Sequence, residues 1–99
     1  MFAATACEAM EKNRCLELRY DGFHRLLEVH AVGQTREGHW VMRAWQISGG
    51  SVSNEPVGWK LLRLDEAYAA MVTHHRSWAP REGYKPGDRA MGGGIRCQL

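Results

Sequence analysis

The fold of this 99-residue chain is decided by CLELRY (residues 15–20), HRLLEVHAV (24–32), HWVMRAWQI (39–47) and GWKLLRL (58–64). In each run apolar residues tend to recur at every second position, which is the period of a β-strand with one buried face. The dipeptide Asp21-Gly22 separates the first two runs and is a strong hairpin signal, and the polar segment GQTREG (33–38) separates the next two. The pattern predicts an antiparallel meander and therefore a mainly β fold.

The flanking segments predict a helix before these strands and a fifth strand after them. Ala3–Asn13 is rich in helix formers and lacks Gly and Pro, and Thr5 is its expected cap. One helical turn is expected after the fourth run, and Ala69–His74 suits a fifth strand that would close a small barrel. Beyond residue 78, Gly and Pro predict an irregular tail with at most a short edge strand at Ile95–Leu99. The expected parts are residues 1–13 (N-terminal helix), 14–78 (β-barrel domain) and 79–99 (Gly/Pro-rich tail).

Composition limits the classes of protein to which the chain can belong. Its length fits one domain, its net charge is +2, and no apolar run approaches the ~20 residues of a membrane span. Because no basic leader precedes a long apolar block, we expect a soluble, cytoplasmic protein. Cys7, Cys15 and Cys97 are an odd number of cysteines without CxxC spacing, and they predict reduced thiols rather than a disulfide framework or a zinc site.

The titratable residues predict neither an enzyme nor a cofactor. His74 and His75 are adjacent, so on a strand they would point to opposite faces and would not share a metal ion. His24, His30 and His39 are formal candidates for a general base, but no Ser or Cys lies in a recognisable nucleophile motif. We therefore expect no catalytic residue, no metal and no cofactor.

Positive charge gathers on the predicted strands. Residues 12–64 carry eight cations against five anions, an excess far smaller than the basic patch of a duplex-DNA binder. Affinity for an anion would have to come from a focused pocket. Apolar residues lie on both faces of the third and fourth runs, so the outer surface must also be covered, by the helix, the tail or a second copy of the chain. Of these we favour a homodimer.

The order of several short motifs resembles the WYL domain family. The motifs are Arg19-Tyr20, Arg25, Gly38–Met42 and Lys60–Glu66. The resemblance covers roughly residues 14–74 and implies a small, strongly bent antiparallel sheet, an Sm-like (SH3-like) β-barrel that senses ligands in bacterial transcription regulators. Trp40-Val41-Met42 stands where the family has Trp-Tyr-Leu and lacks the hydroxyl group. We also expect a stand-alone module, without a helix-turn-helix domain before it.

The same resemblance implies a ligand face built from basic and aromatic strand residues. Arginine binds phosphate or carboxylate through two parallel hydrogen bonds, and a nearby tryptophan can stack on a base. The loop Ser48–Pro56 would form an exposed rim over the site. For any one cation, the alternative is an outward-facing side chain that only keeps the sheet soluble and its edges protected. The predicted ligand-binding residues are Arg19, Tyr20, Arg25, Arg43, Trp45, Lys60 and Arg63, with Trp59 as a second stacking residue.

Two functions from different classes stay open. The first is a regulatory module that binds an anionic ligand, a nucleotide or a single-stranded nucleic acid, and controls a bacterial or phage process. Its binding would be salt-sensitive. The second is an adaptor that has no small-molecule ligand and binds a partner protein through the sheet edge or the Gly-rich tail. Neither function involves a membrane.

Overall fold

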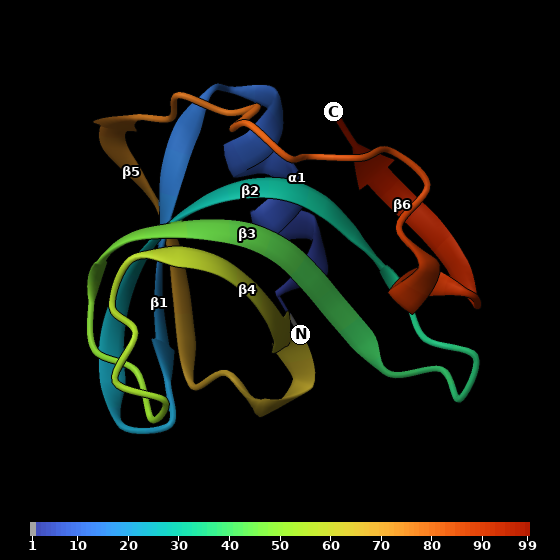
Figure 1. The fold of residues 1–99 in the computed structure, drawn as a ribbon, viewed down its shortest axis with the longest axis horizontal. Helices are drawn as coiled ribbons and strands as arrows, with labels where there is room; N and C mark the ends of the chain where they lie inside the picture. The colour runs from blue at the N-terminus through green and yellow to red at the C-terminus, as the bar shows by residue number, and fades with distance from the viewer. Residues whose placement is uncertain (1) are drawn as a thin grey trace.

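A long strand, β2 (Phe23–Gln34), organises the fold in the computed structural model, which describes residues 2–99 (Figure 1). One edge of β2 pairs with β3 (Trp40–Gly49), while the other pairs first with β1 (Arg14–Tyr20) and then with β6 (Gly94–Gln98). The strands β4 (Gly58–Arg63) and β5 (Ala69–Arg76) complete the order β4-β3-β2-β1-β5. Every strand pair is antiparallel. The prediction of a mainly β fold with an antiparallel sheet is confirmed.

The sheet is bent but not closed. Across the described part of the chain, β4 and β5 end the strand order and do not pair with each other, so the expected barrel is unconfirmed. The strands curve visibly in Figure 1, and the β2–β3 register shifts between Leu26 and Leu27 and again between Val29 and Ala31. In the second shift His30 is the extra residue, and a bulge of this kind bends the strand. The short helix η1 (Leu64–Glu66) provides the helical turn predicted between β4 and β5.

Helix α1 (Ala3–Glu11) covers the inner face of the sheet, where it joins the main core. Its buried residues recur at helical spacing and pack with residues such as Leu16, Leu27 and Met42 of the strands. The short N-terminal helix is thus confirmed. Its predicted cap is wrong, because the helix begins at Ala3 and Thr5 lies inside it. No helix in residues 2–99 is long and apolar enough to cross a membrane.

The C-terminal segment, residues 77–99, covers the outer face of the sheet. The short helix η2 (Arg89–Met91) places Met91 against Ala31 and Val41, and β6 follows along the edge of β2. Of the three coverings expected from the sequence, the structure uses this tail on the outer face. A second copy of the chain is no longer needed to explain the apolar outer face, and the homodimer stays a prediction.

Cys7 of α1 and Cys97 of β6 form a disulfide across a sequence separation of 90. The expectation of three reduced thiols is therefore wrong for these two residues. The physical reason is the pairing of β6 with β2 beside α1, which brings the two Cα atoms to 6.0 Å, within bridging range. Cys15 is free and buried, and burial raises the pKa of its thiol to about 11. It behaves as a core residue rather than a reactive thiolate.

A buried carboxylate fixes the start of the C-terminal segment to the sheet. Glu28 is fully buried on β2 and accepts hydrogen bonds from Arg81 Nε at 2.6 Å, from Arg81 Nη2 at 3.2 Å and from the Trp78 N–H. His30 is equally buried, and its Nε2 accepts the Arg81 N–H at 2.9 Å while its Nδ1 donates to the Glu28 carbonyl oxygen. Buried charges are tolerated only when they are paired in this way. The contacts therefore hold residues 78–81 on the outer face.

The stability of the fold is expected to fall as the pH drops below 6.5, the ordinary pKa of histidine. Burial lowers the pKa of His30, whose Nε2 must stay unprotonated to accept the Arg81 N–H. As the pH falls, His30 is therefore protonated at a higher pH in the unfolded chain than in the folded one. The stabilisation that neutral His30 provides is complete above pH 6.5 and is lost as the pH falls toward the pKa of His30 in the folded state. Urea unfolding from roughly pH 8 to pH 5 measures the loss, with His74→Gln, at an exposed histidine, as the control. A His30 ring that NMR shows to titrate above pH 6.5 would contradict this expectation.

Candidate anion-binding site

The β1–β2 turn and the loop between β3 and β4 lie at the same end of the sheet (Figure 1). Four polar or aromatic side chains belong to the strand segments near this end. Each lies two positions from a residue of the main core, and alternate residues of a strand share a face, so all four belong to the inner face. We call this group the Arg25 cluster. Its members are Tyr20 at the end of β1, Arg25 near the start of β2, Gln46 on β3 and Lys60 on β4.

Arg25 is a buried cation with few polar partners. Its side chain is 3% exposed, and Nη1 donates one long hydrogen bond, 3.4 Å, to Gln46 Oε1. The carboxylate oxygen Oδ2 of Asp21 lies 3.9 Å from Nη2, and Nε is buried with no hydrogen-bond partner within residues 2–99. The guanidinium carbon lies 5.1 Å from the centre of the Tyr20 ring and 6.0 Å from that of Phe23. Because a buried charge is costly unless it is paired and hydrogen-bonded, Arg25 has unused capacity for an anion.

The loop between β3 and β4 lies over the Arg25 cluster. Gln46 Nε2 donates to the Gly50 carbonyl oxygen at 3.0 Å, and Lys60 Nζ donates to Ser51 Oγ at 3.2 Å. Gly50 packs so closely on the Phe23 ring that any Cβ at this position would clash with it. The loop therefore supplies only neutral oxygen atoms as hydrogen-bond acceptors in these two contacts. An oxygen atom of a bound anion can replace them as acceptor.

The charges of the cluster favour an oxyanion. Lys60 is half-buried and, within the described residues, forms no ion pair, so the cluster holds two cations against the distant Asp21 carboxylate. Phosphate and carboxylate oxygens form short, charge-assisted hydrogen bonds with guanidinium and ammonium groups. The chemistry that these groups offer is the binding of an anion through charged hydrogen-bond donors.

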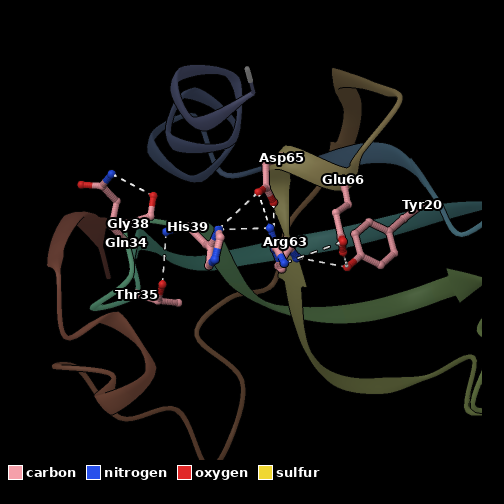
Figure 2. Close-up of polar contacts among 8 residues, drawn as sticks. All are labelled: Tyr20, Gln34, Thr35, Gly38, His39, Arg63, Asp65 and Glu66. Atoms are coloured by element: carbon pink, nitrogen blue, oxygen red, sulfur yellow. Dashed lines mark hydrogen bonds and ion pairs between the residues drawn. The ribbon is translucent and has the colours of Figure 1, made fainter.

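Arg63, a predicted ligand residue, is already engaged in an ion-pair network (Figure 2). Its Nε and Nη2 donate to the Asp65 carboxylate at 3.0 and 2.6 Å, and these hydrogen bonds raise the pKa of Arg63 and lower that of Asp65. His39 completes the network on one side of Arg63, with Nδ1 at 3.1 Å from Nη2. Arg63 therefore has less capacity than Arg25 to bind an external anion.

Tyr20 lies on the other side of Arg63 and contributes its ring, not its hydroxyl, to the Arg25 cluster (Figure 2). The hydroxyl donates to Glu66 Oε1 at 3.1 Å and accepts the Arg63 N–H at 3.3 Å. Burial raises the pKa of Tyr20, so the hydroxyl keeps the proton that it donates. The ring then serves as one wall beside the guanidinium of Arg25.

The structure separates the other predicted residues from the cluster. Arg43 and Trp45 project to the outer face, where Arg43 Nε pairs with Asp88 Oδ2 at 2.6 Å. Arg19 is exposed at the end of β1. A single pocket uniting Arg25, Arg43 and Arg63 is therefore not formed, because successive residues of a strand point to opposite faces. Of the seven predicted residues, Tyr20, Arg25 and Lys60 lie on the inner face, where the Tyr20 ring lies beside the Arg25 guanidinium and Lys60 contacts the loop that also covers Gln46.

Gln46 belongs to the cluster although no sequence motif indicates it. The available signal is a single amide inside the apolar run HWVMRAWQI, since a fully buried glutamine must find hydrogen-bond partners. Within residues 2–99 no three His, Cys, Asp or Glu side chains are grouped so that they could hold a metal ion. Comparisons with known protein families, with curated proteins and with solved structures find no match for this chain.

Proposed function

We propose that the protein is a regulatory module that senses a small phosphate-type anion at the Arg25 cluster. The observation that carries the proposal is the buried Arg25 guanidinium, whose Nε lacks a hydrogen-bond partner in the described chain and whose contact with Asp21 is 3.9 Å long. Proteins ordinarily pair a charge that is buried to this degree. An anion bound between Arg25 and Lys60 would supply the missing partner.

The proposed module is Sm-like and related to WYL domains, as the sequence motifs imply. The N-terminal helix followed by a curved antiparallel sheet in the order β4-β3-β2-β1-β5 supports this proposal. The gathering of Tyr20, Arg25 and Lys60, all from the quoted motifs, supports it further. A module of this kind would couple the bound anion to a bacterial or phage regulatory process.

The burial of the cluster favours a phosphate group over a length of nucleic acid. Nonspecific binding of single strands uses an exposed basic groove with stacking rings along it. Arg25 instead is buried beneath a loop, and Arg63 is paired with Asp65. The sequence predicts a nucleotide or a single-stranded nucleic acid as the ligand. We narrow this proposed ligand to the phosphate group, which both kinds of molecule carry.

Arg25→Met is expected to weaken anion binding strongly without lowering the stability of the fold. Removing one partner of a buried ion pair is destabilising because it leaves a buried charge without a partner, but Asp21, the carboxylate near Arg25, is 53% exposed and stays solvated when Arg25 is replaced by an apolar side chain of similar length. Loss of two or more charge-assisted hydrogen bonds should weaken phosphate binding by at least about 100-fold. Isothermal titration calorimetry at low salt with inorganic phosphate, AMP and a short oligothymidine measures the binding, and thermal unfolding measures the stability.

Two lysine variants provide the internal comparison. Lys60→Met should weaken phosphate binding about tenfold through loss of one charged donor, whereas Lys12→Met removes an exposed lysine of the helix end and should leave it unchanged. Equal phosphate affinity in the wild type, Arg25→Met and Lys60→Met would refute the proposal. A wild type that binds no phosphate, together with a strongly destabilised Arg25→Met, would assign Arg25 to stability instead.

A second candidate function, an adaptor for a partner protein, is favoured by the outer edge of β5, with which no other strand of residues 2–99 pairs. This strand ends the sheet order, and it exposes 57% of Met71, with Tyr68 just before it exposed as well. An open strand edge can accept an extended peptide from another protein. The tail is less suited to this role than the sequence suggested, because it packs on the outer face.

A further inference from the structure

A cavity of about 710 Å³ lies on the outer face of the sheet, opposite the face that holds the Arg25 cluster. Its walls come from β3, β4 and the C-terminal segment. Small-molecule sites usually occupy about 300–1,000 Å³, so the volume suits a ligand of that class. The lining residues that carry chemistry are Arg43, Trp59, Tyr84, Lys85, Asp88 and Arg89.

The segment that forms one wall of this cavity is fixed at both ends. At its start Arg81 is bound to the buried carboxylate of Glu28, and at its end Met91 is buried against β2 and β3. Between these points Gly83 and Gly87 have φ values of 92° and 75°, which glycine adopts without steric cost. The wall is therefore formed by the fold itself, before any ligand binds.

Two aromatic rings make the apolar part of the cavity. The ring centres of Trp59 and Tyr84 lie 6.5 Å apart with 29° between their planes. Trp59 packs against His30 and Trp45, with ring centres at 4.6 and 5.4 Å, and the Tyr84 hydroxyl donates to the Leu99 carbonyl oxygen at 3.1 Å. Rings held in place in this way offer faces on which a planar ring can stack.

The cavity also carries an excess of positive charge. Arg43 is neutralised by Asp88, to which its Nε and Nη2 donate at 2.6 and 3.2 Å, and these hydrogen bonds lower the pKa of Asp88. Lys85 and Arg89 both line the cavity and form no ion pair with any residue from 2 to 99. Two unpaired cations beside two rings match a ligand that combines a planar ring with an anionic group.

We propose that this cavity is a second ligand site, which binds a nucleoside monophosphate with its base on Trp59 and Tyr84 and its phosphate at Lys85 and Arg89. The site does not depend on the function proposed for the Arg25 cluster. A separate cavity of about 190 Å³ is lined by Arg25 but by no other residue of the Arg25 cluster, and its volume is below the usual range for a ligand with a base and a sugar.

The test follows the indole N–H signal of Trp59 in ¹⁵N–¹H NMR spectra of the full chain during a titration with AMP at low salt. A saturable shift is expected. Adenosine lacks the phosphate and ribose 5-phosphate lacks the ring, so each should bind at least about tenfold more weakly than AMP. The double variant Lys85→Ala/Arg89→Ala should weaken AMP binding by at least about tenfold, whereas Lys12→Ala/Arg14→Ala removes two exposed cations elsewhere and should not.

These variants distinguish a failure of the second ligand site from a failure of the Arg25 cluster. Lys60→Met, which should weaken phosphate binding at the Arg25 cluster, should leave the AMP-induced shift of Trp59 unchanged. The second site is ruled out if AMP produces no saturable shift, if ribose 5-phosphate binds as tightly as AMP, or if Lys85→Ala/Arg89→Ala binds AMP as the wild type does.

Discussion

Reduction of the Cys7–Cys97 disulfide is expected to lower the free energy of unfolding by about 4 kcal/mol. The bond joins residues separated by 90 positions, and closing so long a loop restricts the unfolded chain more than closing a short one. A loss of this size is a large share of the roughly 5–15 kcal/mol that stabilises a typical small domain. Urea unfolding with and without dithiothreitol measures the difference.

Cysteine variants separate the effect of the bond from other effects of the reductant. Cys97→Ser should match the reduced wild type and should not respond to dithiothreitol, while Cys15→Ala, at the free thiol, should keep the full response. Equal stability of the wild type with and without reductant would contradict the prediction. Since disulfides persist mainly in oxidising compartments, the state of Cys7 and Cys97 in cells also tests the cytoplasmic location that the sequence predicts.

Glu28→Gln is expected to lower the free energy of unfolding by roughly 3 kcal/mol. The substitution leaves the shape of the side chain but removes a fully buried charge that accepts hydrogen bonds from Arg81 and from the Trp78 N–H. One carboxylate oxygen becomes an amide N–H₂ group that can no longer accept from its donor. Because these contacts attach the C-terminal segment to β2, hydrogen exchange in residues 78–91 should also become faster.

The matched control is Glu55→Gln, which makes the same change in an exposed loop and should alter stability by less than about 0.5 kcal/mol. Combining Glu28→Gln with Arg81→Gln should cost less than the sum of the two single changes, because the two residues share one interaction. Full additivity, or a Glu28→Gln variant as stable as the wild type, would show that the ion pair does not hold the segment in place.

Local sequence patterns are sufficient to predict the strands. The four quoted runs correspond to β1–β4, and Asp21-Gly22 forms the turn between the first two, with Asp21 at a φ of 51°. These features depend on residues that are neighbours in the chain, so periodicity and turn composition reveal them. The prediction that Thr5 caps the helix is wrong because the residues on both sides of Thr5 are compatible with a helix. Packing, rather than the local sequence, decides where the helix begins.

The place of the C-terminal segment cannot be predicted from local patterns. Its Gly and Pro residues indicate irregular backbone, yet β6 pairs with β2 because β1 occupies only the first half of one edge of that strand and leaves the second half of this edge for β6. The same pairing brings Cys97 to Cys7, so the disulfide becomes visible only once the fold is known. The spacing of the cysteines in the sequence does not indicate that two residues 90 positions apart are in contact.

The candidate site is predictable only in part. The residue types indicate an anion site, and in the structure the Tyr20 ring lies beside Arg25 while Lys60 contacts the loop over the same face. Whether a cation is available to bind an anion depends on partners that are distant in the sequence. Asp88 of the C-terminal segment, for example, neutralises Arg43 of β3. The outer cavity cannot be predicted from the sequence, because the residues that line it are distant in the chain and come together only when the tail packs on β3 and β4.

The proposal that Arg25 binds an anion is tested most directly by the ¹⁵N–¹H NMR signal of the Arg25 Nε–H group during a titration with inorganic phosphate. The signal is assigned by its disappearance in Arg25→Met. Because this N–H is buried without an acceptor in residues 2–99, phosphate is expected to shift the signal saturably and to slow its exchange with water. An Arg25 Nε–H signal that stays unchanged throughout the titration, at low salt, would contradict the proposal.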